Sequence, residues 1–134
     1  MFRGARGRGK LPAVPRILVI DDEQTVALMI RRALEEDHVV TVEHSALGAV
    51  DRIVRGERYD AMVADLNLAD GDAIWIRDEL RRIDAALPSR LLVLTGGASS
   101  RAGQSFLEEP GVRWLQKPFR ARELQERLEE VLKA

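Results

Sequence analysis

The sequence of 134 residues predicts an α/β fold, a doubly wound parallel sheet built from five βα units. From Ile17 onward, short apolar segments that suit strands alternate with amphipathic segments that suit helices. The strand segments are apolar at nearly every position, which is typical of parallel sheets covered on both faces. Polar side chains follow these strands directly, where doubly wound sheets bind their ligands.

The first two units occupy residues 17–54. Residues 17–20 (ILVI) are the first predicted strand, and residues 38–44 (HVVTVEH) are the second. Apolar residues at helical spacing after each strand predict two amphipathic helices. The predicted buried face of the first helix consists of Val26, Met29, Ile30, Ala33 and Leu34, and that of the second of Leu47, Val50, Ile53 and Val54.

The remaining three units follow the same pattern. Residues 59–66, 90–95 and 112–116 are predicted strands, and helices are predicted near 72–86 and around 99–109. The predicted buried face of the closing helix consists of Leu124, Leu128, Val131 and Leu132. At this length the chain is expected to form one domain with a single sizeable core.

Composition excludes several classes of protein. The absence of cysteine excludes disulfides, thiolate metal sites and cysteine nucleophiles. The longest apolar runs are far shorter than the ~20 residues of a membrane span. The basic N-terminus lacks the apolar segment of a secretory signal. We therefore expect a soluble cytoplasmic protein with no membrane contact.

Charge is distributed unevenly along the chain. Residues 1–16 contain five basic residues and no acidic one, whereas the remainder contains 16 basic and 22 acidic residues. The Gly- and Pro-rich segment GARGRGKLPAVP has no periodicity. Residues 1–15 are therefore predicted to be a flexible basic leader or linker, and residues 16–134 the folded domain. Weak binding of the leader to nucleic acid or an anionic surface is a less favoured alternative.

Charged and polar residues gather after the predicted strands. The acidic run DDE (21–23) follows the first strand, Asp65 ends the third, Thr95 ends the fourth, and Lys117 follows the fifth. Because these strands are parallel, their carboxyl ends lie on one edge of the sheet. Like charges side by side are unfavourable unless a cation compensates. Oxygen ligands without nearby histidine or sulfur favour Mg²⁺ or Mn²⁺. Alternatively, Asp21 and Asp22 could simply cap the following helix.

A divalent cation at this edge makes Asp65 a candidate nucleophile for phosphoryl transfer, since carboxylates form acyl phosphates. Lys117 can pair with a phosphoryl oxygen, and the Thr95 hydroxyl can donate to another. Such chemistry depends mostly on positioning and electrostatics.

The chain from about residue 16 to 134 resembles the receiver domain of two-component response regulators. The resemblance rests on VIDDE, DLNLADGD, LTGG and KPF, each after its strand, together with the βα alternation. It implies a flavodoxin-like (βα)5 sheet with strand order 2-1-3-4-5. It further implies a phosphorelay protein that accepts a phosphoryl group on Asp65 from the phosphohistidine of a histidine kinase or phosphotransfer protein. Such a protein is no enzyme beyond self-catalysed phosphorylation and dephosphorylation.

The resemblance also implies detail at the site. Asp21, Asp22, Asp65 and the backbone carbonyl of Asn67 would hold Mg²⁺, and the Lys117–Pro118 peptide would be cis. Trp114 occupies the place of an aromatic switch residue that moves with Thr95; a partly buried tryptophan that never moves is equally favoured. The switching surface would comprise the fourth helix, the fifth strand and the fifth helix.

Further expectations concern docking, histidines and departures from the family pattern. A kinase docking patch is predicted from Val26, Leu28, Met29 and Phe119, although single surface apolar residues are common. His38 and His44 are expected to be structural and far from the acidic edge. Ala69 and Ala73 stand where receivers often have proline and glycine, so Ala73 is strained if its φ is positive and favourable if it is helical. Asn67 and Gly97 occupy positions that tune phosphoryl lifetime, and no lifetime is inferred.

Two other functions stay open at this stage. One is a docking module of the same fold that is never phosphorylated. The other is a Mg²⁺-dependent aspartyl phosphatase, disfavoured because DDE lacks the Asp-x-Asp spacing of those enzymes. No segment resembles a DNA-reading helix pair, so direct DNA binding is not expected. The chain could be a free-standing regulator or the terminal receiver of a hybrid kinase.

Overall fold

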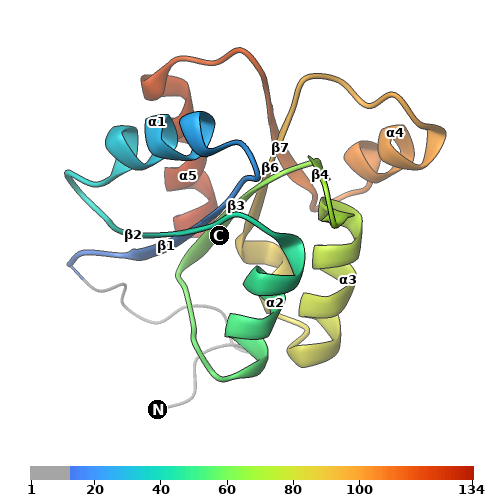
Figure 1. The fold of residues 1–134 in the computed structure, drawn as a ribbon, viewed down its shortest axis with the longest axis horizontal. Helices are drawn as coiled ribbons and strands as arrows, with labels where there is room; N and C mark the ends of the chain where they lie inside the picture. Colours follow the sequence, from blue (N-terminus) through green and yellow to red (C-terminus); the bar gives the residue numbers. More distant parts are fainter. Residues whose placement is uncertain (1–12) are drawn as a thin grey trace.

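A computed structural model describes residues 13–134 as a five-stranded parallel sheet with helices on both faces (Figure 1). The strands of this sheet are β1 (Arg16–Ile20), β2 (Val39–Glu43), β3 (Ala61–Asp65), β6 (Leu91–Thr95) and β7 (Arg113–Gln116). The α-helices are α1 (Gln24–Leu34), α2 (Ala46–Val54), α3 (Ala73–Ile83), α4 (Arg101–Glu108) and α5 (Ala121–Lys133). The hairpin strands β4 (Asn67–Leu68) and β5 (Gly71–Asp72) and the 3-10 turn η1 (Leu87–Arg90) were not predicted.

The strand order confirms the predicted topology. The sheet runs β2-β1-β3-β6-β7, and every neighbouring pair is parallel. Numbered among the five sheet strands alone, this is the flavodoxin-like order 2-1-3-4-5. The chain moves outward from β1 to β2 and then crosses back to β3, so the order reverses between β1 and β3. A ligand site is expected beyond the carboxyl ends of these two strands.

The core has two layers, one on each side of the sheet. Leu18 and Ile20 of β1 belong to the core layer on the side of α2, α3 and α4, whereas Ile17 and Val19 belong to the layer on the side of α1 and α5. All four side chains are almost fully buried. Because both faces of the strand are covered, its sequence is apolar at every one of these positions.

Three predicted members of helix faces are wrong. Met29 of α1 and Leu47 and Val54 of α2 are exposed, at 54%, 60% and 65%. Ala27 and Ala49 are buried in their helices instead. Small alanines bring the backbone close to the sheet but add little apolar surface to a sequence pattern. The predicted faces were therefore rotated toward the larger side chains.

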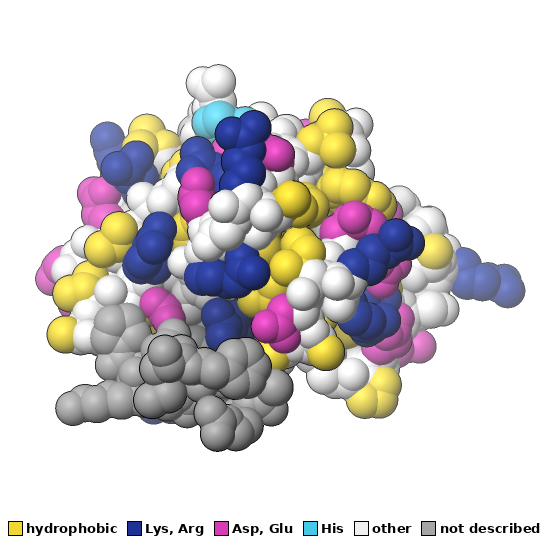
Figure 2. Space-filling model, turned by 90° about the horizontal axis from the view of Figure 1, so that it is seen from below, with side chains coloured by type: hydrophobic (Ala, Val, Ile, Leu, Met, Phe, Trp, Pro, Cys, Tyr) yellow, Lys and Arg dark blue, Asp and Glu magenta, His cyan; other side chains and the backbone are white. Residues whose placement is uncertain are grey.

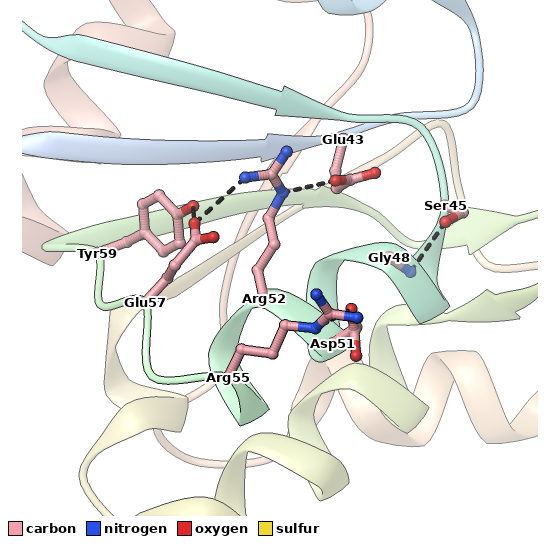
Figure 3. A network of polar contacts seen from close by, with 8 residues as sticks. All are labelled: Glu43, Ser45, Gly48, Asp51, Arg52, Arg55, Glu57 and Tyr59. Atoms are coloured by element: carbon pink, nitrogen blue, oxygen red, sulfur yellow. Dashed lines mark hydrogen bonds and ion pairs between the residues drawn. The ribbon is translucent and has the colours of Figure 1, made fainter.

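A polar network fixes α2 to the edge of the sheet (Figure 3). The Arg52 guanidinium contacts Glu43 of β2 and Glu57 of the segment that precedes β3, and the Tyr59 hydroxyl donates to Glu57. The hydrogen bonds that Arg52 donates to Glu43 and to Glu57 raise the pKa of Arg52 above its ordinary value, against desolvation by burial, which lowers it. Arg52 therefore joins three consecutive segments of the fold.

Charges of both signs share the surface at the lower ends of α2 and α3. Figure 2 shows Lys and Arg side chains interspersed with Asp, Glu and apolar atoms on the described part of this face. Within residues 13–134, no helix combines the length and the hydropathy that a bilayer crossing requires. The predicted basic leader falls mostly on residues 1–12, which lie outside the described residues.

Candidate functional site

Three carboxylates converge beyond the carboxyl ends of β1 and β3. Ile20 pairs with Ala64 across the two strands, so the next residues, Asp21 and Asp65, lie side by side. One oxygen each from Asp21, Asp22 and Asp65 lies within 4.8 Å of the others. Asp21 and Asp65 are over forty residues apart in the sequence, and the parallel pairing of β1 with β3 brings them together.

Asp21 is the member of this cluster whose negative charge is least favourable in its surroundings. It is 1% exposed, its Oδ1 accepts the Glu23 backbone N–H at 2.9 Å, and its Oδ2 has no hydrogen-bond partner among the described residues. Burial raises the pKa of Asp21, and repulsion from Asp65 and Asp22 raises it further. An unpartnered buried carboxylate oxygen beside two other carboxylates fits the oxygen-ligand preference of a hard divalent cation. The residues present therefore fit Mg²⁺ or Mn²⁺.

Asp22 also holds the loop after β3. Its Oδ2 accepts the Ala69 backbone N–H at 2.8 Å. A proline at position 69 would have no N–H to donate, so this contact depends on the alanine. Ala73 is the buried first residue of α3, and no described non-glycine residue has a positive φ. The helical alternative for Ala73 is therefore the right one, and the loop carries no strain there.

Lys117 reaches the acidic cluster from the segment after β7. Its Nζ lies 3.1 Å from Asp65 Oδ2, and its backbone N–H donates to the Thr95 carbonyl. The Lys117–Pro118 peptide is cis, as predicted. Three carboxylates and one ammonium leave a formal charge of −2 at this edge, which one divalent cation balances.

Thr95 borders a shallow pocket between the sheet and α4. The residue is buried, and its Oγ1 accepts the Gly97 backbone N–H at 2.9 Å. Gly97 has a φ of +122°, a conformation that side chains with a Cβ rarely adopt. The pocket has a volume of about 330 Å³ and is bordered by Thr95, Leu107 and Trp114. Trp114 of β7 is 37% exposed beside it.

The other predicted residues divide between surface and core. Asn67 is exposed in β4, and its role as a carbonyl ligand remains a prediction. Leu28 and Met29 are about half exposed on α1. Val26 and Phe119 are partly buried against the α1–α5 layer of the core. Two of the four predicted docking residues are thus exposed and two are partly buried.

His44 lies close to the acidic edge, against the expectation that it is far away. Its Nδ1 is 3.0 Å from the Asp21 backbone carbonyl oxygen. Because a carbonyl only accepts, Nδ1 carries the proton in this contact. The error arose because β2 and β1 are neighbours, so that the end of β2 lies beside Asp21. His38 lies at the opposite end of β2, where its Nδ1 contacts the Leu34 carbonyl.

Asp70 is a structural residue that sequence reasoning missed. Its Oδ1 accepts the Ala46 N–H at 2.8 Å and its Oδ2 accepts the Leu47 N–H at 2.9 Å. Ser45, the residue before α2, accepts the Gly48 N–H. The first three N–H groups of α2 are thereby satisfied. A sequence signal for the Ser45 cap exists, but none points to a cap supplied from 24 residues away.

Comparison with known sequences finds one matching family profile and several similar proteins. The profile of the response regulator receiver domain matches residues 17–129. The response regulators MprA of Mycobacterium avium strain 104 and of Mycobacterium tuberculosis strain H37Rv are each 33% identical over 119 residues, or 88% of this chain. The chain spans about half the length of these relatives, 51% and 50%.

Solved structures share the fold. A response regulator receiver protein from Sinorhizobium medicae superimposes with a TM-score of 0.77 at 24% identity, covering 90% of this chain and 96% of that chain. A sensor protein from Polaromonas sp. JS666 has a TM-score of 0.73 at 30% identity, with coverage of 89% and 96%. Both likenesses extend over nearly the whole described chain.

Proposed function

Because this chain belongs to the response regulator receiver domain family, we propose that it accepts a phosphoryl group on Asp65 in a two-component phosphorelay. The donor is the phosphohistidine of a histidine kinase or a histidine phosphotransfer protein in the cytoplasm. The receiver domain is assigned to residues 16–134, and residues 1–15 to a leader or linker.

One observation carries the proposal: Asp65 lies between a carboxylate cluster and an ammonium group. Asp21 and Asp22 lie on one side of it, and Lys117 Nζ is 3.1 Å from its Oδ2. Asp65 itself is buried, with only 9% of its surface exposed, and these neighbours hold it in place. A docking module with no phosphoryl chemistry would have no use for this concentration of charge.

Transfer forms an O–P bond at an Asp65 carboxylate oxygen and breaks the N–P bond of the donor, whose imidazole nitrogen keeps the electron pair. Asp21, Asp22, Asp65 and the Asn67 carbonyl are the proposed holders of Mg²⁺. The bound ion supplies charge neutralisation for the carboxylates and the phosphoryl oxygens. Lys117 exchanges its contact with Asp65 for one with a phosphoryl oxygen, and the Thr95 hydroxyl donates to another.

Switching follows from the group that Asp65 gains. A phosphoryl group adds about −1.5 to −2 charges at an edge lined by Thr95 and Lys117. Movement of Thr95 toward it opens the pocket for Trp114, which alters the surface of α4, β7 and α5. The exposed Leu28 and Met29 on α1 are the proposed centre of the kinase docking patch, with Val26 and Phe119 at its partly buried rim.

The test is incubation with acetyl phosphate and Mg²⁺, followed by intact mass measurement. The wild-type protein should gain one acid-labile phosphoryl mass, and Asp65→Asn should gain none. Glu23→Gln is the matched control, because Glu23 is an exposed neighbour of the cluster, and it should be modified like the wild type. Unmodified wild-type protein would contradict the proposal and favour a docking module that is never phosphorylated.

A further inference from the structure

Helix α4 is attached to the rest of the domain by few buried side chains. Of its eight residues, only Gly103 and Phe106 are buried. Gly103 contributes no side chain, and a glycine within a helix makes that helix less stable than an alanine would. The helix lies at the margin of the molecule, beside α3 (Figure 1). Its position therefore depends on the surroundings of Phe106 and on the contacts at its ends.

Open space borders the C-terminal half of α4 on two sides. A pocket of about 210 Å³ lies between α3 and α4, and Phe106 and Glu109 are among the residues that line it. The pocket of about 330 Å³ beside Thr95 is lined in part by Leu107 and Glu108. Close packing does not confine a helix where it borders a pocket, so individual contacts determine where this part of α4 lies.

Arg77 of α3 supplies contacts of this kind. Its side chain is 10% exposed, and its guanidinium carbon lies 5.0 Å from the centre of the Phe106 ring. Its Nη1 donates to Glu109 at 3.0 Å, and its Nε donates to Asp78 of its own helix at 2.8 Å. Glu109 directly follows α4, and its backbone N–H donates to the Phe106 carbonyl. Arg77 thus holds the last turn of α4 through an aromatic ring and a carboxylate.

The same turn of α4 borders the pocket proposed for the switch. Leu107 and Glu108 lie between the two residues that Arg77 contacts, and they line the pocket beside Trp114. We propose that entry of the indole ring requires this turn to move, so that Arg77 holds α4 in the unphosphorylated arrangement and opposes the switch at Asp65. This inference rests on the proposed function and names a positioning residue that regulates it.

A restraint of this kind changes the affinity of Asp65 for a phosphoryl substitute. When a ligand binds best to one of two arrangements, its apparent affinity is reduced by the fraction of molecules in that arrangement. Loss of the restraint raises this fraction and therefore the affinity. A contact that only stabilised the fold would lower the melting temperature on removal and leave the affinity unchanged.

The experiment is a titration of the full chain with beryllium fluoride, a stable substitute for the phosphoryl group, at saturating Mg²⁺. The NMR signal of the Gly97 amide, which donates to Thr95 Oγ1, follows the binding. Arg77→Gln and Glu109→Gln should each lower the half-saturating concentration about fivefold. The two substitutions change the net charge in opposite directions, so a gain in both cannot come from long-range electrostatics.

The double variant tests whether the two residues act through one contact. Arg77→Gln/Glu109→Gln should bind no more tightly than Arg77→Gln, because that substitution already removes the ion pair. Circular dichroism verifies that each variant is folded. Glu109 is 45% exposed, so Glu109→Gln provides the test even where loss of Arg77 impairs folding. Arg82→Gln is the matched control on α3: Arg82 is 78% exposed near Glu79 and should bind beryllium fluoride like the wild type.

The outcomes separate this inference from the proposed function. Wild-type protein that binds beryllium fluoride, with equal or lower affinity in Arg77→Gln and Glu109→Gln, would overturn the inference and leave the proposed function intact. Fully additive gains in the double variant, or an equal gain in Arg82→Gln, would also overturn it. Absence of binding in the wild type would contradict the proposed function and this inference together.

Discussion

Asp21 combines near-complete burial with a carboxylate oxygen that no described donor satisfies. Burial raises the pKa of Asp21, with Asp65 and Asp22 adding to the effect. A carboxyl group with a raised pKa in the folded state favours its protonated form there. Its charge therefore lowers the free energy of unfolding at neutral pH when no cation is bound. The residue suits cation binding at the cost of stability without it.

Replacement of this charge should stabilise the metal-free protein. In Asp21→Asn, the amide oxygen can still accept the Glu23 N–H, and the NH₂ group can donate toward the neighbouring carboxylates. In EDTA we expect the variant to have a melting temperature a few degrees higher than that of the wild type. This corresponds to an increase of about 1 kcal/mol in the free energy of unfolding. Excess Mg²⁺ should raise the melting temperature of the wild type but not that of the variant.

Thermal unfolding followed by circular dichroism measures both effects, with Glu23→Gln as the control that retains the response to Mg²⁺. A variant that melts below the wild type in EDTA, or that keeps the full gain from Mg²⁺, would show that Asp21 is not the costly ligand described above.

At the scale of single elements, α2 depends on a partner outside its own segment. Hydrogen bonds from the Leu47 and then the Ala46 backbone lower the pKa of Asp70. A carboxylate with a depressed pKa contributes stability that is present above its unfolded pKa and is lost as the pH falls through its folded pKa. The anchor between Asp70 and α2 therefore weakens in acid.

Asp70→Asn should reveal this anchor. Only one of the two backbone N–H groups can find an acceptor on an asparagine side chain, and the charge at the helix N-terminus is lost. We expect the free energy of unfolding to fall by about 1 kcal/mol at about pH 7. The difference should begin to shrink toward pH 3, because the carboxylate of the unfolded wild type becomes protonated below the ordinary aspartate pKa of about 3.9 before that of the folded protein does.

Urea unfolding at the two pH values tests the prediction. Asp51→Asn, on the exposed side of the same helix, should change stability by less than about 0.5 kcal/mol. If the free energy of unfolding of Asp70→Asn were lower by the same amount at both pH values, the cause would be the shape of the side chain and not the carboxylate charge.

The elements also show what could be predicted from sequence. Apolar runs such as ILVI located β1, β3 and β6, because burial on both faces leaves a strong pattern in these strands. The helix faces were less accurate, since Ala27 and Ala49 carry the close packing while Met29 and Leu47 carry most of the apolar surface. The hairpin β4–β5 was missed because each of its strands has only two residues.

At the scale of the whole molecule, the parallel sheet explains why the acidic edge could be predicted. Asp21, Asp65, Thr95 and Lys117 follow four different strands, and parallel pairing brings all four ends to one side. The contact of Asp70 with α2, in contrast, depends on the turn between β4 and β5. The pocket between α3 and α4 also joins Arg77, Leu91 and Phe106, which no local sequence pattern connects.

Helix α4 borders one pocket on each side. Phe106 and Glu109 border the pocket between α3 and α4, whereas Leu107 and Glu108 border the pocket beside Thr95 and Trp114. Thr95 and Trp114 border the same pocket, so a switch that moves Thr95 changes the surroundings of Trp114. Tryptophan emission reports on that change directly.

Trp75 would obscure this signal, so the measurement uses Trp75→Phe, in which Trp114 is the only tryptophan. Trp75 packs at the edge of the core in α3, away from the switching surface. Beryllium fluoride with Mg²⁺ imitates the phosphoryl group on Asp65. Addition of both should shift the Trp114 emission to shorter wavelength by several nanometres, because the 37% exposed ring enters the apolar pocket beside Thr95.

The same titration in Trp75→Phe/Thr95→Ala isolates the coupling. Loss of the hydroxyl removes the donor to the phosphoryl group but leaves Asp65 and the acidic cluster intact, so binding continues while the emission shift disappears. A shift that persists without the hydroxyl would assign the movement to another residue. Emission unchanged in Trp75→Phe, although the ligand binds, would mean that Trp114 is a fixed part of the surface and that the domain signals without it.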